Sequence, residues 1–266
     1  MGILNVTPDS FSDGNRFFST GAALDQALKL LDGGADLLDL GGESTRPDAT
    51  PVTAEEEQSR MLPVLRAILK ARPHAPPILS VDTYHTSTAQ AALDAGAEII
   101  NDVSGLLWDS AMAGVLAREQ AGAVLMHARG TPKTWKALPP LARAEVMPLV
   151  LSGLRDTVGS ARAAGILDSH IVLDPGFGFG KLGDANFTLL AGFTQLQQLG
   201  LPLLAGVSRK RFLTAQMPHA TEEDRLHATI AANVAAILSG AHILRVHDVP
   251  AACAAALVAD SILSGA

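Results

Sequence analysis

The sequence holds a single cysteine, Cys253, among its 266 residues. One cysteine excludes an internal disulfide framework and a cysteine-based zinc site, and it is typical of a protein from a reducing compartment. Cys253 lies in an alanine-rich helical pattern, and we interpret it as a small buried hydrophobic residue. Aromatic residues are also scarce, at 4% of the chain, so Leu, Val, Ile and Ala must fill the core.

The chain has no excess of positive charge, and its formal net charge is −7. This balance disfavours a general surface for nucleic acid or for an anionic membrane, although a local cluster of cations inside a cleft is compatible with it. We therefore expect no nucleic-acid partner.

Uninterrupted apolar runs long enough to span a membrane are also missing. Residues 185–208 and 226–244 lack Asp, Glu, Lys and Arg, but each contains polar residues and Gly and is typical of a helix, a turn and a strand in succession. The N-terminus has no basic segment followed by an apolar stretch. We expect no membrane partner and a cytoplasmic location.

Short β-rich apolar runs alternate with longer stretches of helical period, and we count eight of each. In the helical stretches apolar residues recur every three or four positions, as at Leu226, Ile230 and Val234. This alternation predicts an α/β fold, a (β/α)₈ TIM barrel, and no linker divides it, so we expect one domain over residues 1–266. The predicted strands are 2–6, 36–40, 78–81, 98–101, 123–127, 171–174, 203–207 and 243–246.

Polar residues stand at or just beyond the carboxyl end of every predicted strand. In a barrel these ends converge on one face, where the active sites of this fold are built. Solubility alone does not explain the pattern, because the neighbouring strand residues are aliphatic. The residues are Asn5, Asp39, Asp82, Asn101, His127, Asp174, Ser208 with Lys210, and Arg245 with His247.

The loop after the first strand, residues 5–14, is rich in turn-forming residues. It is either a plain connection with local hydrogen bonds, or a mobile cover whose Asn5, Asp9 and Asp13 supply oxygen atoms near a diphosphate and Mg²⁺. The loop after the second strand, residues 41–47, pairs two glycines with Arg46, which suits an anion, although the pattern taken alone favours a plain Gly-rich turn.

Two further segments favour a ligand site. The string Asp-Pro-Gly-Phe-Gly-Phe-Gly-Lys at 174–181 makes a poor strand and a poor helix, and we interpret it as an aromatic wall beside a flat ligand. Residues 208–211 and 245–248 bring cations together after the last two strands, where barrels often bind phosphate, although a solvated basic patch is the alternative. Asp82, Asn101 and Asp174 offer an edge for a heterocycle, but Asp82 and Asp174 would also suit a metal, and Asp174 would also suit a cap for the turn at Pro175.

Taken in order, these segments resemble the dihydropteroate synthase family over nearly the whole chain. The matching strings are Asn-Val-Thr-Pro-Asp-Ser-Phe-Ser-Asp-Gly, Gly-Gly-Glu-Ser-Thr-Arg-Pro, Ser-Val-Asp-Thr, Ile-Asn-Asp-Val-Ser-Gly, Leu-Met-His, Asp-Pro-Gly-Phe-Gly-Phe-Gly-Lys, Gly-Val-Ser-Arg-Lys and Arg-Val-His-Asp. The first and the sixth are the most specific.

The resemblance implies a homodimeric transferase of folate biosynthesis that joins a dihydropterin diphosphate to 4-aminobenzoate with Mg²⁺. It implies catalytic roles for Lys210, Arg245, His247, Asp9 and Asp13, and a metal ligand in Asn5. It further implies a pterin pocket and an aminobenzoate site, the latter the target of sulfonamides. Their residues would be Asp82, Asn101, Met126, Asp174, Lys210, Arg245 and Gly206 for the first, and Thr45, Arg46, Pro47, Phe11, Phe179 and Ser208 for the second.

Two other functions are compatible with parts of this pattern. A pterin-binding methyltransferase of the methyltetrahydrofolate type would share the pterin pocket without releasing diphosphate. A catalytically silent relative would bind pterin or a partner protein without turnover.

Overall fold

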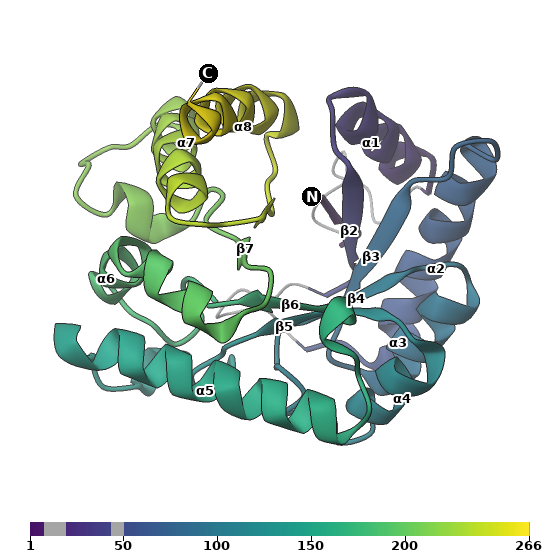
Figure 1. Cartoon of the computed structure of the whole chain (residues 1–266). Helices are drawn as coiled ribbons and strands as arrows, with labels where there is room; N and C mark the ends of the chain where they lie inside the picture. Colours follow the sequence, from purple (N-terminus) through teal and green to yellow (C-terminus); the bar gives the residue numbers. More distant parts are fainter. Residues whose placement is uncertain (8–19, 44–50, 266) are drawn as a thin grey trace.

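The computed structural model describes residues 1–7, 20–43 and 51–265. Within these residues eight strands alternate with eight α-helices, which lie around the outside of the strands (Figure 1). The strands are β1 (Gly2–Asn5), β2 (Leu37–Gly41), β3 (Ile78–Asp82), β4 (Ile99–Asp102), β5 (Gly122–Met126), β6 (Ile171–Asp174), β7 (Leu204–Ala205) and β8 (Ile243–Leu244). The predicted order of elements is therefore confirmed.

The helices follow the strands one for one. The α-helices are α1 (Thr20–Asp32), α2 (Ala54–Ala71), α3 (Thr86–Asp94), α4 (Met112–Glu119), α5 (Arg143–Ala163), α6 (Ala185–Ala191), α7 (Glu222–Leu238) and α8 (Val249–Ser264). Shorter 3₁₀ helices are η2 (Trp135–Ala137), η3 (Asp168–His170), η4 (Phe193–Leu199) and η5 (Arg211–Thr214). Threonine hydroxyls cap two of the α-helices: Thr53 accepts the N–H of Glu56 and Thr221 that of Asp224.

All neighbouring strands are parallel, but they do not form one continuous sheet. β1 to β6 make a six-stranded sheet in sequence order, and β7 pairs only with β8. Isolated bridges, Leu173 with Leu203 and Gly2 with Val246, lie at the two seams, so the predicted barrel is not closed as an unbroken sheet. β7 and β8 are also shorter than predicted. β7 lies between Pro202, which has no N–H to donate, and Gly206, which has no side chain to pack.

Side chains alternate between the inside of the strands and the helices outside. In β2, Leu38 and Leu40 are fully buried in the large core that includes residues of the helices. Leu37 belongs instead to a small cluster drawn from Met1 and the strands alone, with Val124 and Leu204. Because successive strand residues point to opposite faces, Asp39 shares the inner face with Leu37. The interior thus has an apolar floor and a polar upper layer.

Two expectations about the periphery can be compared with the structure. In the described residues no helix is sufficiently long and apolar to cross a membrane. Cys253 on α8 is half-buried rather than buried, and its thiol donates to the carbonyl of Gly34 at 3.3 Å, so its polar atom has a partner.

Glycine at position 176 permits a close approach between the chain segments that follow β5 and β6. Gly176 has a φ of +68°, and a Cβ there would lie 2.1 Å from the carbonyl oxygen of His127. We expect Gly176→Ala to lower the free energy of unfolding by about 2 kcal/mol or more, because strain and clash add. Thermal unfolding followed by circular dichroism measures this.

Gly159 supplies the matched control. It lies inside α5, and a Cβ there meets nothing within 4 Å. Gly159→Ala should therefore raise stability by about 0.5–1 kcal/mol. Equal effects of the two substitutions would contradict the tight approach at Gly176.

Candidate active site

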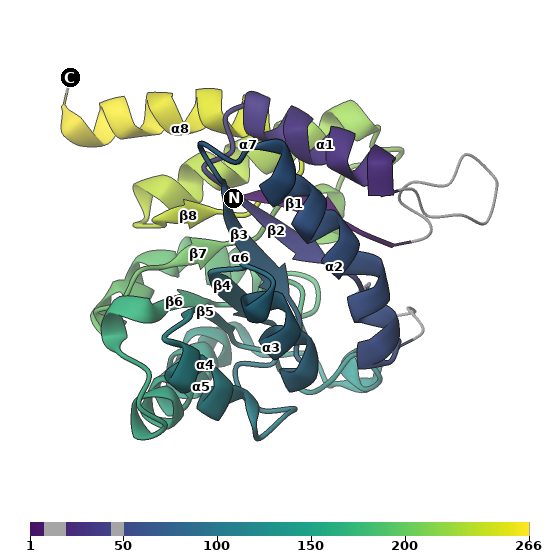
Figure 2. The same cartoon turned by 90° about the vertical axis from the view of Figure 1, so that its right-hand side faces the viewer.

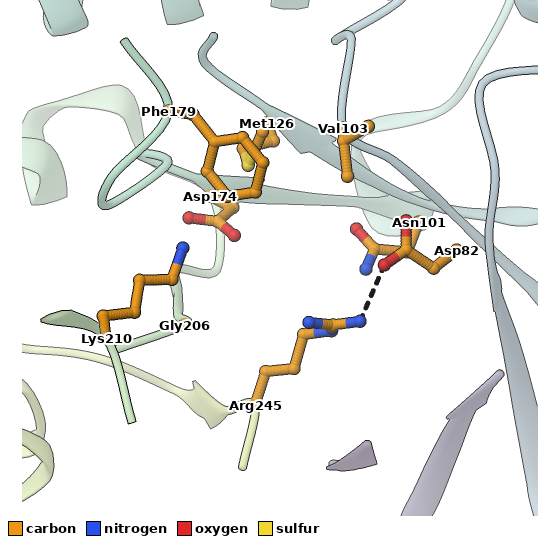
Figure 3. Close-up of a pocket in the computed structure, with 9 residues that line it drawn as sticks. All are labelled: Asp82, Asn101, Val103, Met126, Asp174, Phe179, Gly206, Lys210 and Arg245. Carbon is orange, nitrogen blue, oxygen red and sulfur yellow. Dashed lines mark hydrogen bonds and ion pairs between the residues drawn. The ribbon is translucent and has the colours of Figure 1, made fainter. Parts of the chain in front are cut away.

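A cavity opens at the carboxyl ends of the strands. Its lining side chains come from six strands or the residues just after them, and they point toward one another (Figure 3). They are Asp82, Asn101, Val103, Met126, Asp174, Phe179, Gly206, Lys210 and Arg245. Eight of the nine were predicted as substrate-binding residues from the sequence; Val103 was not.

The guanidinium of Arg245 lies between two carboxylates. Its Nε donates to Asp39 Oδ2 at 2.6 Å, and its Nη2 donates to Asp82 Oδ2 at 2.7 Å. The second of these bonds is drawn in Figure 3. Arg245 follows β8, whereas its partners lie on β2 and β3, so these ion pairs cross the interior. Two charge-assisted bonds fix the plane of the guanidinium at the wall of the cavity.

Asp39 is the centre of the hydrogen bonds beneath the cavity. Its side chain is fully buried and accepts from the Ser80 hydroxyl at 2.6 Å and from Asn101 Nδ2 at 3.0 Å, in addition to Arg245. Sequence analysis placed Asp39 among the polar strand ends but gave it no role. The inward alternation of β2 was the signal that could have identified it.

Burial changes the acidity of the carboxyl groups that line the cavity. Burial is the main cause that raises the pKa of Asp82 from 3.8 to about 7; the charge of Arg245 opposes this shift, and the charges of Asp39 and Glu57 contribute to it. Burial also raises the pKa of Asp174. One oxygen of Asp174 accepts the N–H of Gly176 at 2.7 Å, so the predicted turn cap and the cavity wall are the same residue.

The segment after β6 is held from behind by Lys181. This lysine is 1% exposed, and its ammonium donates to the carbonyls of His127, Gly176 and Phe179 at 3.0, 2.8 and 3.2 Å. Three donors thus meet three acceptors, which places Phe179 in the cavity wall. Burial lowers the pKa of Lys181 to about 7. The sequence pattern predicts the aromatic wall but not the lysine that supports it.

Lys210 lines the cavity next to Phe179. Its ammonium lies 4.2 Å from the centre of the Phe179 ring, donates to the carbonyl of Phe177, and points toward Asp174 (Figure 3). Burial lowers the pKa of Lys210 to about 8, although the charge of Asp174 raises it. Lys210 is therefore a cation whose charge depends on its neighbours.

Ser208 and His247 lie beside the cavity rather than in its lining. The Ser208 hydroxyl is 3.0 Å from His247 Nδ1 and accepts the backbone N–H of His247 at 3.2 Å. Arg209 turns away and makes two bonds to Asp248, at 2.9 and 2.6 Å. Of the cations at 208–211 only Lys210 lines the cavity, so the predicted cluster divides into one cavity residue and surface residues.

The remaining predicted residues either do not line the cavity or lie outside the described part of the chain. Asn5 ends β1 and is half-buried, and it is not among the residues that line the cavity. Asp9, Phe11, Asp13, Thr45, Arg46 and Pro47 lie outside the described residues. Their roles stay predictions.

Fold and cavity together define a (β/α)₈-barrel enzyme whose active site lies at the carboxyl ends of the strands. A family model described as "Pterin binding enzyme" matches residues 1–247. The chain belongs to this family of pterin-binding enzymes and, within it, to the dihydropteroate synthases, as three relatives show.

The dihydropteroate synthase of Synechocystis is 40% identical over 262 residues, which cover 98% of this chain and 89% of that protein. The Xanthomonas albilineans dihydropteroate synthase, solved with 4-aminobenzoic acid, is 40% identical with a TM-score of 0.89, over 98% of this chain and 92% of that one. The Yersinia pestis dihydropteroate synthase, solved with a sulfonamide drug, is 36% identical with a TM-score of 0.90, over 100% and 93%.

The raised pKa of Asp82 predicts how stability varies with pH. The folded protein keeps a proton on Asp82 that the unfolded chain releases between its pKa of 3.8 and about 7. The stabilising contribution of this group is therefore present below the unfolded pKa and is lost as the pH rises through the folded pKa. We expect the unmodified protein to lose stability relative to Asp82→Asn between about pH 4 and about pH 7, with no further loss above that range, measured by urea unfolding.

The same substitution at Asp168 provides the comparison. Asp168 is exposed and its bond from Arg162 lowers its pKa below 3.8, so Asp168→Asn should show almost no trend in this range, because the contribution of Asp168 is lost only as the pH falls below about 4. A difference between unmodified protein and Asp82→Asn that is independent of pH would contradict the assignment at Asp82.

Proposed function

We propose that this protein joins 6-hydroxymethyl-7,8-dihydropterin diphosphate to 4-aminobenzoate, giving 7,8-dihydropteroate and diphosphate. The observation that carries this proposal is the convergence of three hydrogen-bonding side chains and two cations in one cavity. Asp82, Asn101 and Asp174 line it together with Lys210 and Arg245 (Figure 3). One set suits a flat heterocycle and the other suits an anionic leaving group.

The pterin pocket follows from the chemistry of these walls. A pterin presents an edge of alternating donors and acceptors, which the carboxyl groups of Asp82 and Asp174 and the amide of Asn101 complement. Met126 and Phe179 supply apolar surface for its flat faces. Arg245 is held at the cavity wall by its two carboxylates, and we assign it to the ring face and to the diphosphate.

We assign the Mg²⁺ that the family resemblance implies to oxygen donors of and after β1. Among the described residues no group of three or more His, Cys, Asp or Glu could hold a metal ion. One amide oxygen, that of Asn5, suits an ion that keeps several waters and is otherwise bound by phosphate oxygens. When bound, Mg²⁺ neutralises charge that develops on the diphosphate. Asp9, Asp13 and His247 complete this set in our proposal.

The reaction requires positioning of the two substrates and stabilisation of the departing diphosphate rather than a strong base. The bond from the pterin methylene carbon to the diphosphate oxygen breaks, and its electron pair leaves with the diphosphate. The electron-rich pterin supports positive charge at that carbon, so we propose a dissociative, S_N1-like displacement. The aryl amine then forms the carbon–nitrogen bond and loses one proton to solvent. Lys210 and Arg245 stabilise the departing anion.

The aminobenzoate site is assigned by the same proposal to Thr45, Arg46, Pro47, Phe11, Phe179 and Ser208. Of these, Phe179 and Ser208 are described, and Phe179 lies at the cavity wall with Trp135 packed against it at 5.2 Å between ring centres. Sulfonamides, which bind the Yersinia relative, would compete at this site.

Lys210→Ala tests the assignment of the catalytic cation. We expect kcat/KM to fall about 100-fold or more, since a cation that contacts the leaving group acts chiefly in the transition state. Release of diphosphate, dependent on 4-aminobenzoate and on Mg²⁺, is the assay. Lys29→Ala, an exposed lysine of α1, is the control and should keep full activity. Unchanged kinetics in Lys210→Ala would remove Lys210 from the mechanism.

We also propose a cytoplasmic homodimer formed through the outer helices. The single cysteine suits a reducing compartment. On α8, Leu257, Val258, Ile262 and Leu263 are 58–70% exposed, and α8 lies along the outside of the molecule (Figure 2). Several exposed aliphatic side chains on one outer helix favour burial against a second copy.

Replacing Leu257 and Ile262 together by Asp should produce monomers with an intact fold. Light scattering after size-exclusion chromatography gives the mass, and circular dichroism gives the fold. A dimer of unchanged mass in the double variant would place the interface elsewhere.

A further inference from the structure

We infer that Asp39 is a positioning residue for pterin recognition: it holds Arg245 and Asn101 in their binding orientations without contacting the substrate. The inference rests on the proposed function, because it concerns the same pocket. Asp39 is absent from the residues that line the cavity, yet it binds two residues that do line it.

Both oxygens of the Asp39 carboxylate are occupied by side-chain donors. Oδ1 accepts from the Ser80 hydroxyl at 2.6 Å, and Oδ2 accepts from Arg245 Nε and Asn101 Nδ2 at 2.6 and 3.0 Å. The side chain has no exposed surface. A fully buried carboxylate with three short bonds has little freedom to rotate, so it defines where its donors lie.

The two carboxylates that bind Arg245 have different surroundings. Asp82 lines the cavity, where a pterin would compete for its oxygens, whereas Asp39 lies beneath the cavity and is shielded from the ligand. When substrate binds, Arg245 Nη2 can therefore exchange its bond to Asp82 for one to the substrate, while Nε keeps its bond to Asp39. Asp39 thus serves as the permanent counter-ion of Arg245, which prevents the cost of a buried unpaired charge.

Asp39 also influences the charge of Asp82. The groups that act on Asp82 are Arg245 just after β8, Asp39 on β2, Glu57 on α2 and Asp102 on β4. Among these the negative charge of Asp39 raises the pKa of Asp82. Loss of this charge should lower the pH at which Asp82 ionises and shift the pH profile of pterin binding with it.

Asp39→Asn removes the charge and preserves the shape. The amide oxygen can accept from Arg245 and Asn101, while the amide N–H groups face the Ser80 hydroxyl, which accepts in place of donating. We expect kcat/KM for the pterin diphosphate to fall about 10- to 100-fold, the range for loss of a charged hydrogen-bond partner. The KM for 4-aminobenzoate should change by less than about twofold, since Asp39 touches only pterin-side residues. The acidic limb of the pH profile should move to lower pH.

Asp168→Asn is the matched control, because Asp168 also makes a two-bond pair, with Arg162, but is exposed and lies just before β6 at the opposite ends of the strands. Its kinetics should equal those of the unmodified protein. Turnover by the unmodified protein tests the proposed function, whereas the ratio of variant to unmodified protein tests Asp39. Calorimetric titration with the pterin diphosphate compares the affinities of the variant and the unmodified protein, so it tests Asp39 even without turnover.

The inference is overturned if Asp39→Asn binds and turns over the pterin diphosphate as the unmodified protein does, or if both substrates are affected equally. Should Asp39→Asn yield no folded protein by circular dichroism, Ser80→Ala decides. This variant removes one bond to Asp39 and leaves its charge. A smaller loss confined to the pterin substrate supports the inference, and unchanged pterin kinetics in Ser80→Ala overturn it.

Discussion

The ion pairs of Arg245 with Asp39 and Asp82 join parts of the fold that the backbone joins only weakly. β7 and β8 form a separate pair, and isolated bridges connect them to the six-stranded sheet. Through Arg245, the residue after β8 is tied by two charge-assisted bonds to β2 and β3 across the interior. Burying three charges is costly unless each has a partner, so the arrangement favours one geometry over others rather than adding much stability.

The same burial sets the chemistry of the cavity. Withdrawal from water brings the pKa of Asp82 to about 7 and that of Lys210 to about 8, so both groups change charge close to neutral pH. Groups of this kind respond strongly to a neighbouring charge. A diphosphate that enters beside Lys210 would favour its protonated form, and a donor edge of a heterocycle would favour the ionised form of Asp82. We therefore expect substrate binding to change the protonation of Lys210 and Asp82.

Much of this arrangement could be predicted from the sequence, because it depends on periodicity. The eight strands, their order and the polar residues at their carboxyl ends follow from alternating apolar runs, and eight predicted residues meet in one cavity. Asp39 and Lys181 were missed for a different reason. Their roles depend on partners distant in the sequence, since Asp39 binds a residue 206 positions away and Lys181 binds one 54 positions away. The alternation of β2 indicates that Asp39 points inward, but no local pattern identifies its partners.

The short lengths of β7 and β8 were also not predicted from the sequence. Residues 203–207 and 243–246 have the composition of longer strands, but a ladder forms only where a neighbour offers matching groups, and Pro202 and Gly206 limit this for β7. The loops that hold Asp9, Asp13, Thr45 and Arg46 lie outside the described residues. Their contribution to the site therefore rests on the family resemblance.

A crystal structure of the protein with its dihydropterin diphosphate bound would test the central claim most directly. The account predicts that the heterocycle contacts Asp82, Asn101 and Asp174, that the diphosphate lies on the side of Lys210 and Arg245, and that Arg245 still binds Asp39. A pterin bound in another cavity, or an Arg245 that has left Asp39, would contradict it.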